Sequence, residues 1–259
     1  MLEQARGADV LISLSSFGAA EVRRHGQPWF ARLAARAGAD GVEVRGELLV
    51  DARAELPALA DAVSTLRCVY SSPNGLWAAD GALDRGALEL GIERACALGA
   101  PRLKMSIGGF GATSAGTLAT LRERMADTPV ELVIENDQTA AAGTVAALVR
   151  FFDAADEAGL PLGMTFDMGN WHWTGECPQQ AASTFTQRVR YVHCKGVQRQ
   201  PHRWIAVPLA ESAAPWRAVL RAMPADVPRA IEYPLAGDDL LDVTRREVDA
   251  LRRIARGLA

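Results

Sequence analysis

Short apolar runs alternate regularly with longer amphipathic segments along this chain, and that alternation limits the possible folds more than any other feature. Three of the longer segments, Gly86–Leu98, Thr144–Ala158 and Leu240–Ile254, have the pattern of helices with one apolar face. Several short runs are continuously apolar, which is typical of parallel strands buried on both faces. The eight short runs are Val10–Leu14, Gly41–Val44, Cys68–Tyr70, Arg102–Ile107, Glu131–Glu135, Leu162–Asp167, Tyr191–His193 and Ala230–Tyr233.

One kind of short connection recurs between a helical segment and the strand after it. Residues 37–40, 98–101 and 158–161 each place a glycine where the helix would end. Glycine adopts the left-handed conformation of a helix C-terminus at little cost, so the recurrence indicates a repeated structural unit. Eight such units predict an α/β fold, a (β/α)8 TIM barrel that spans residues 1–259 as a single domain.

An open, doubly wound sheet is the alternative fold. Its first strand usually leads into a glycine-rich phosphate loop, G-x-G-x-x-G, whereas residues 14–18 of this chain read LSSFG. A length of 259 residues suits one barrel domain, and no Pro/Ser-rich linker divides the chain. The closed barrel is therefore the preferred prediction.

Charge and cysteine usage exclude several classes of function. A net charge of −3 gives no basic excess, so nucleic acid is not an expected partner. The four cysteines include no C-x-x-C pair, which argues against a cysteine-based zinc site and suits a cytoplasmic location. The first ten residues include Glu3, Arg6 and Asp9 and no long apolar run, so neither a signal peptide nor a membrane span is expected.

Ionisable residues stand at the ends of four successive predicted strands. The active sites of barrels form at these C-terminal strand ends. Three carboxylates that converge there would repel one another without a counter-charge, which a divalent cation supplies. Mostly oxygen ligands with one imidazole favour Mn²⁺, Mg²⁺ or Co²⁺ as the single divalent metal ion, with Zn²⁺ as an alternative. The predicted ligands are Glu135, Asp167, His193 and Glu232.

The segments that carry these four residues form a recognisable set of motifs. They are Leu132–Asn136 (LVIEN), Phe166–Asn170 (FDMGN), Val192–Lys195 (VHCK) and Ala230–Pro234 (AIEYP). In these motifs, and over essentially its whole length, the chain resembles the sugar phosphate isomerase/epimerase superfamily, the barrels similar to xylose isomerase and the ketohexose 3-epimerases. The resemblance implies that the four residues bind the metal and that the two glutamates are the acid/base pair.

The resemblance also implies a reaction. Glu135 or Glu232 would remove a proton from a small sugar, keto-polyol or hydroxy-keto acid, and the other would return one after a metal-stabilised enediolate. Loss of water from a keto-polyol uses the same site, so a dehydratase of inosose or dehydroshikimate type is the nearest alternative. A DNA-repair endonuclease would need a histidine-rich trinuclear zinc site, and the chain has four histidines. A non-catalytic sugar-binding barrel would not need two opposed carboxylates.

Two positions near the motifs are candidates to contact the substrate. The epimerases place a substrate-contacting arginine six residues beyond the metal histidine, which implies this role for Arg199. They place a substrate-facing histidine three residues after the metal aspartate. That position is Asn170 in this chain, and His172 follows two residues later.

Further candidates share a strand face with a neighbouring polar residue. Glu43 and Arg45 are two residues apart on the second predicted strand, as are Lys104 and Ser106 on the fourth, so both pairs could point into the barrel mouth. Lys195 shares the strand side of His193. Structural ion pairs are the alternative role for these residues. The expected partner is a small carbohydrate-like molecule, and the sequence is compatible with a homo-oligomer.

Overall fold

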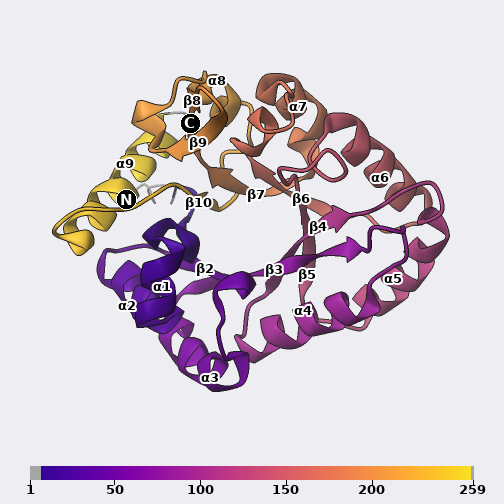
Figure 1. Ribbon diagram of the computed structural model, residues 1–259, viewed down its shortest axis with the longest axis horizontal. Coiled ribbons are helices and arrows are strands. Elements are labelled where there is room, and N and C mark those ends of the chain that lie inside the picture. The colour runs from indigo at the N-terminus through magenta and orange to yellow at the C-terminus, as the bar shows by residue number, and fades with distance from the viewer. Residues whose placement is uncertain (1–6, 258–259) are drawn as a thin grey trace, which may run out of the picture.

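The computed structural model, which describes residues 7–257, is a closed barrel of parallel strands surrounded by helices (Figure 1). Adjacent strands pair in parallel around the whole ring, and the pairing of the first strand with the last closes it. The prediction of a (β/α)8 TIM barrel is confirmed. In order around the barrel the strands are β1 (Val10–Ser13), β10 (Arg229–Ile231), β7 (Val189–Cys194), β6 (Gly163–Asp167), β5 (Glu131–Glu135), β4 (Arg102–Gly108), β3 (Arg67–Trp77) and β2 (Gly41–Arg45).

Predictions about residues 1–6 and 258–259 lie outside the described residues. They comprise the expected lack of a signal peptide and the two outer limits of the domain. Within residues 7–257, no helix is both long enough and apolar enough to cross a membrane.

The helices start and stop where the local sequence provides capping groups. Asp84 and Thr144 each accept a hydrogen bond from the backbone N–H three residues later, at the first turn of α4 (Arg85–Ala97) and α6 (Val145–Glu157). The glycines of the three recurring connections, Gly38, Gly99 and Gly159, have φ values of 88°, 63° and 68°, which confirms the predicted helix ends. The helices are α1 (Ala19–His25), α2 (Gln27–Arg36), α3 (Ala52–Val63), α4 (Arg85–Ala97), α5 (Leu118–Ala126), α6 (Val145–Glu157), α7 (Pro178–Phe185), α8 (Trp216–Arg221) and α9 (Leu240–Gly257).

The interior of the barrel changes from apolar to polar along the strands. Leu11, Val69, Tyr191 and Ala230 form a separate buried cluster that fills its lower part. Side chains two residues apart on a strand share a face, so the next inward position on β7 after the tyrosine is His193. The apolar layer therefore closes the bottom of the barrel and leaves the ionisable residues at the C-terminal strand ends.

Three strand details differ from the sequence-based expectation. Strand β3 continues to Trp77, beyond the predicted Cys68–Tyr70, with a register irregularity between Ser71 and Gly75. Strand β10 ends at Ile231, so Glu232 lies immediately after the strand. An antiparallel hairpin of β8 (Gly196–Gln200) and β9 (Arg203–Val207), absent from the predicted pattern, follows β7 directly.

Candidate metal centre

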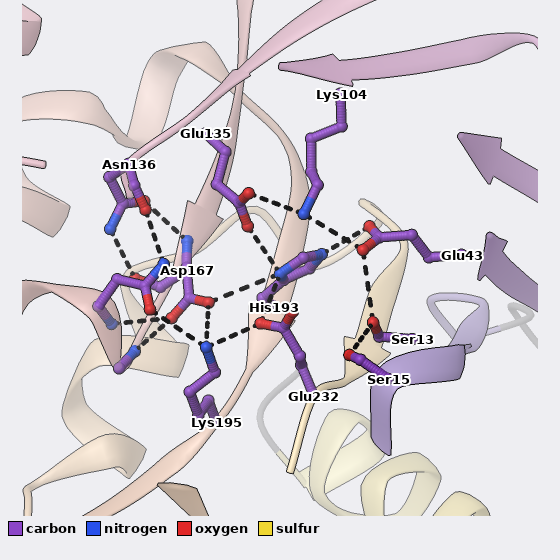
Figure 2. A network of polar contacts seen from close by, with 12 residues as sticks. Ser13, Ser15, Glu43, Lys104, Glu135, Asn136, Asp167, His193, Lys195 and Glu232 are labelled. Atoms are coloured by element: carbon purple, nitrogen blue, oxygen red, sulfur yellow. Dashed lines mark hydrogen bonds and ion pairs between the residues drawn. The ribbon is translucent and has the colours of Figure 1, made fainter. Parts of the chain in front are cut away.

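His193 lies at the centre of a group of carboxylates at the C-terminal end of the barrel (Figure 2). Strand β7 turns its side chain inward, two residues after Tyr191, and buries it completely. Its Nδ1 atom lies 2.9 Å from Glu232 Oε2, 3.0 Å from Glu135 Oε1 and 3.6 Å from Asp167 Oδ2. Carboxylates from the C-terminal ends of β5 and β6 and from the residue after β10 therefore meet at one ring nitrogen.

This arrangement fits a divalent metal better than it fits hydrogen bonding. A ring nitrogen offers one proton or one lone pair, so it satisfies only one of three oxygens. Oδ2 of Asp167 is buried without an aligned hydrogen-bond donor in the described chain, although Lys195 Nζ lies 2.8 Å away. Four residues each offer one ligand atom, these atoms lie within 4.8 Å of one another, and the group could bind a metal ion. They are Glu135, Asp167, His193 and Glu232, the four predicted from the sequence.

Two buried lysines separate the carboxylates from one another. Lys104 is 1% exposed, and its Nζ lies 2.8 Å from Glu135 Oε2. Lys195 is 8% exposed, and its Nζ lies 2.8 Å from both Asp167 Oδ2 and Glu232 Oε2. Both residues predicted to contact substrate are therefore part of the charged group itself.

The pKa values follow from this crowding of opposite charges. Burial lowers the pKa of the His193 imidazole, but the surrounding carboxylates, Glu232 foremost, outweigh it and raise that pKa well above its usual range. Burial likewise raises the pKa of Glu232, but His193 and Lys195 hold it well below the usual value. Burial also raises the pKa of Glu135, but Lys104 and His193 outweigh this effect and lower it below the usual value. The group is thus an array of paired charges.

Asp167 is oriented by backbone groups and by a neighbouring amide side chain. Its Oδ1 accepts hydrogen bonds from the N–H groups of Gly169 at 2.8 Å and Asn170 at 2.9 Å. Asn136 bonds the aspartate backbone at both its N–H and its carbonyl oxygen, at 2.9 and 3.0 Å. These contacts leave Oδ2 to face the imidazole. Sequence reasoning missed Asn136, and its position directly after Glu135 was the available signal.

Three further predicted residues lie around this centre at different depths. Asn170 is buried, and its Oδ1 accepts a hydrogen bond from Lys195 Nζ at 3.1 Å. His172 is half-buried outside the metal group, with its ring 4.8 Å from that of Trp204. Arg199 is exposed, with its guanidinium 5.3 Å from the same indole ring. The structure therefore brings Asn170 to the centre, whereas Arg199 on β8 and His172 both lie against Trp204 of the hairpin.

Glu43 and Arg45 lie on one face of β2, as their spacing predicts. Glu43 is fully buried, and its Oε2 lies 2.8 Å from His193 Nε2, the ring nitrogen that does not face the other carboxylates. Arg45 Nη1 lies 2.7 Å from Glu232 Oε1 and 2.8 Å from Glu43 Oε1. Glu43, predicted to contact substrate, is thus enclosed behind the imidazole. The sequence indicated the shared face but not its contacts, which join residues 150 and 187 positions apart.

An open hollow of about 260 Å³ lies beside the centre and gives access to it. Ser15, Lys195, Ala206, Glu232 and Tyr233 are among the residues that line it. A larger hollow of about 660 Å³ lies at the opposite end of the barrel, around the starts of β5, β6 and β7. Barrel chemistry takes place at the C-terminal strand ends, so the smaller hollow is the candidate substrate site.

Comparisons with known proteins agree with this fold and site. A family model described as xylose isomerase-like TIM barrel matches residues 31–254. No curated protein matches the chain in a sequence comparison. Among solved structures, the probable 3-DHS dehydratase AsbF from Bacillus anthracis is similar with a TM-score of 0.69 at 15% identity, covering 94% of this chain and 98% of that one.

Two sugar epimerases are also similar in structure. A D-allulose 3-epimerase from Methylomonas sp., solved in complex with D-allulose, has a TM-score of 0.65 at 17% identity, covering 96% of this chain and 97% of that one. A D-psicose 3-epimerase from Clostridium cellulolyticum H10 has a TM-score of 0.65 at 12% identity, covering 96% and 99%. At these identities the likeness shows the fold, and the family match confirms the resemblance found in the sequence. The chain belongs to the xylose isomerase-like TIM barrel family.

Proposed function

We propose that the protein is a divalent-metal-dependent isomerase or epimerase that moves a proton within a small sugar, keto-polyol or hydroxy-keto acid. One observation carries this proposal. Glu135 and Glu232 approach the same ring nitrogen of His193 from strand ends that β6 and β7 separate in the barrel. Two carboxylates held on different sides of one metal position are suited to remove a proton at one point of a substrate and return it at another.

The charge of the centre favours a substrate that becomes negative during the reaction. Four carboxylates and three cationic side chains leave one net negative charge when the imidazole is neutral. With a divalent metal bound, the same group would carry one net positive charge, which would favour a substrate that develops a negative oxygen. The carboxylates are those of Glu43, Glu135, Asp167 and Glu232, and the cations are Arg45, Lys104 and Lys195.

In this proposal the two glutamates exchange protons with the substrate. One glutamate removes the proton on the carbon next to the carbonyl, and the other returns a proton to the neighbouring carbon or to the opposite face. Lys104 and Arg45 each hold one oxygen of a glutamate, which keeps the second oxygen directed at the centre. When bound, the metal supplies Lewis acidity that polarises the carbonyl and makes the adjacent C–H more acidic.

A dehydratase is the second candidate, and the position of Lys195 favours it. Its ammonium group lines the hollow beside Glu232, where it can donate a hydrogen bond to a substrate hydroxyl. After a glutamate removes the proton, the adjacent C–O bond breaks, a double bond forms, and the hydroxyl takes up a proton and leaves as water. The similar fold of a probable 3-DHS dehydratase supports the same candidate.

Deuterium exchange tests both candidates in one experiment. Protein loaded with Mn²⁺, Co²⁺ or Mg²⁺ is incubated in D₂O with ketohexoses, pentuloses, hydroxypyruvate, inosose and dehydroshikimate, and NMR and mass spectrometry identify the products. Glu135→Gln and Glu232→Gln keep the side-chain shape and remove the base, so each is expected to lower the exchange rate by at least ~10²-fold. Arg203→Ala, an exposed change on the hairpin, is the matched surface control.

Each outcome selects one function. Deuterium in a substrate C–H without loss of water supports the isomerase or epimerase. Loss of water with formation of an enone identifies a dehydratase. No exchange on any compound by metal-loaded protein contradicts the catalytic proposal and favours a sugar-binding barrel. Equal exchange by wild type and both glutamine variants would show that these glutamates are not the acid/base pair.

A further inference from the structure

Glu43 occupies a position behind the metal centre that no other carboxylate shares. Strand β2 places it inside the barrel with 0% exposure, so it cannot reach a substrate in the hollow. Its two oxygens are used differently. Oε2 lies 2.8 Å from His193 Nε2, whereas Oε1 lies 3.2 Å from Lys104 Nζ and 2.8 Å from Arg45 Nη1.

The contact with His193 determines which ring nitrogen can bind a metal. A carboxylate beside Nε2 keeps the proton there, because an ionised carboxylate only accepts hydrogen bonds. Nδ1 is then the nitrogen that would bind a metal, on the side of the ring where Glu135, Asp167 and Glu232 lie 3.0, 3.6 and 2.9 Å away. Such a carboxylate–histidine pair fixes the ring tautomer and orientation of a metal ligand.

The contacts of Oε1 extend to both proposed catalytic glutamates. Lys104 Nζ lies between Glu43 Oε1 at 3.2 Å and Glu135 Oε2 at 2.8 Å (Figure 2). Arg45 Nη1 lies between the same Oε1 at 2.8 Å and Glu232 Oε1 at 2.7 Å. Two cationic side chains therefore connect one buried oxygen to the outer oxygen of each glutamate. The remaining glutamate oxygens are the ones that face the imidazole.

We propose that Glu43 is the positioning residue of this centre, which fixes His193 directly and orients Glu135 and Glu232 through Lys104 and Arg45. The role of the two glutamates in this statement rests on the proposed function. Substitution of one residue on β2 should therefore disturb a metal ligand and both acid/base groups together. A residue that only fills space in the barrel would not have this effect.

Glu43→Gln is the variant that tests the proposal, because it keeps the shape of the side chain and removes its charge. Two readouts need no turnover: Mn²⁺ affinity by titration calorimetry, and the ring ¹⁵N shifts of His193 in the Zn²⁺-loaded protein. We expect Mn²⁺ binding to weaken roughly 10- to 100-fold. We also expect the ¹⁵N resonance of His193 Nε2 to shift, because a neutral amide replaces the carboxylate that accepts its N–H.

Glu47→Gln is the matched control. Glu47 Oε1 also binds Arg45, through Nε at 2.8 Å, but its side chain is 37% exposed, and the ion-pair contacts of His193 within residues 7–257 are with other carboxylates. This variant should keep Mn²⁺ affinity within about 2-fold of wild type and leave the ¹⁵N shifts unchanged. An equal loss in both variants would mean that Arg45, and not Glu43, organises the centre.

Glu43→Asp keeps the proposal testable if the glutamine variant does not fold. Aspartate retains the buried negative charge but is one methylene shorter, so it cannot keep all three contacts. We expect an intermediate loss of Mn²⁺ affinity. For a folded Glu43 variant, wild-type Mn²⁺ affinity together with unchanged His193 shifts would overturn the positioning role.

Turnover measurements separate this inference from the proposed function. On a substrate that wild type exchanges in D₂O, Glu43→Gln should lower kcat with little change in KM, because both glutamates are misplaced while the hollow is intact. If wild type exchanges no compound but the glutamine variant loses Mn²⁺ affinity, the proposed reaction fails and the positioning role stands. If wild type exchanges and the variant keeps its kcat and metal affinity, the positioning role fails alone.

Discussion

Each buried charge at the centre lies against an opposite charge, and this pairing determines how the residues can be studied. Lys104 is buried with carboxylate oxygens of Glu43 and Glu135 at 3.2 and 2.8 Å. Removal of one partner of a buried pair leaves an uncompensated charge, which costs about 3–5 kcal/mol. Glutamine, asparagine and methionine replacements carry this cost as well, and alanine adds a cavity to it, so the free energy of unfolding of each variant should be measured beside its metal affinity.

His172 should make the stability of the protein depend on pH. Burial lowers the pKa of this half-buried imidazole below 6.5, against an opposing effect of Asp167. The unfolded state then binds the proton more tightly than the folded state, so the contribution to stability is complete above about pH 6.5 and declines as pH falls through the lower folded value. His172→Phe keeps an aromatic ring against Trp204 and removes the titration.

Urea unfolding of metal-free wild type and His172→Phe between pH 7.5 and 5 measures this difference. The free energy of unfolding of wild type should fall more steeply with decreasing pH than that of the variant. The ring Cε1–H resonance of His172 should titrate below 6.5 in the folded protein. Parallel pH curves for the two proteins would contradict this prediction.

At the residue scale, the predictable part of the site is the part carried by single strands. Glu135, Asp167 and His193 each end a predicted strand, so periodicity and the C-terminal rule brought them together. The contacts of Glu43 and Arg45 depend on where β2 stands relative to β7 and β10 across the barrel. No local sequence pattern contains the position of one strand relative to another across the barrel. The sequence therefore predicted only that Glu43 and Arg45 share a strand face.

At the element scale, the hairpin β8–β9 is the part of the mouth that the sequence did not reveal. A single residue, Lys195, separates it from β7, and it makes its own two-stranded sheet, so its residues do not continue the barrel pattern. Directly opposed residues share a face, which puts Arg199 with Trp204 and Val197 with Ala206. Ala206 lines the hollow beside Glu232, so this face of the hairpin is directed at the candidate substrate site.

Trp204→Ala should loosen the hairpin without unfolding the barrel. The indole packs against His172 at 4.8 Å and lies under Arg199 at 5.3 Å, and an aromatic pair contributes about 0.5–1.5 kcal/mol. Amide hydrogen exchange in β8 should accelerate about 2- to 12-fold. Strands β4 to β7 should keep their protection.

Arg203→Ala is the control for this prediction. It is the adjacent residue on β9 and lies on the opposite face, paired with Gln200. Its exchange pattern should match that of wild type. Equal acceleration in the two variants would mean that the packing of Trp204 against His172 does not hold the hairpin.

At the scale of the whole molecule, the barrel could be predicted because its evidence is repeated along the chain. Eight strand–helix units and a recurring glycine connection agree with one another, so an error of a few residues in one strand does not change the fold. The predicted end of β3 at Tyr70 is such an error, because the strand continues to Trp77. It follows from pairing with β4 up to Gly108, a non-local contact.

Binding of a metal at the centre should stabilise the entire barrel, because the four ligand residues come from distant parts of the chain and meet only in the folded state. A ligand present at 100 times its Kd stabilises the folded state by about 2.7 kcal/mol. For a chain of this size that corresponds to a rise in Tm of about 5–10 °C. Differential scanning calorimetry with EDTA and with Mn²⁺ measures the shift.

Asp167→Asn distinguishes this centre from other metal-binding positions. The variant keeps an oxygen that can accept the N–H groups of Gly169 and Asn170 but removes one charged ligand. At the same Mn²⁺ concentration its Tm should rise by less than about 2 °C. The weaker site has a higher Kd, so this concentration no longer saturates it. Glu131→Gln, at the opposite end of the barrel, should keep the full rise. An equal rise in all three proteins would place the bound Mn²⁺ elsewhere, and no rise in wild type would contradict the metal centre.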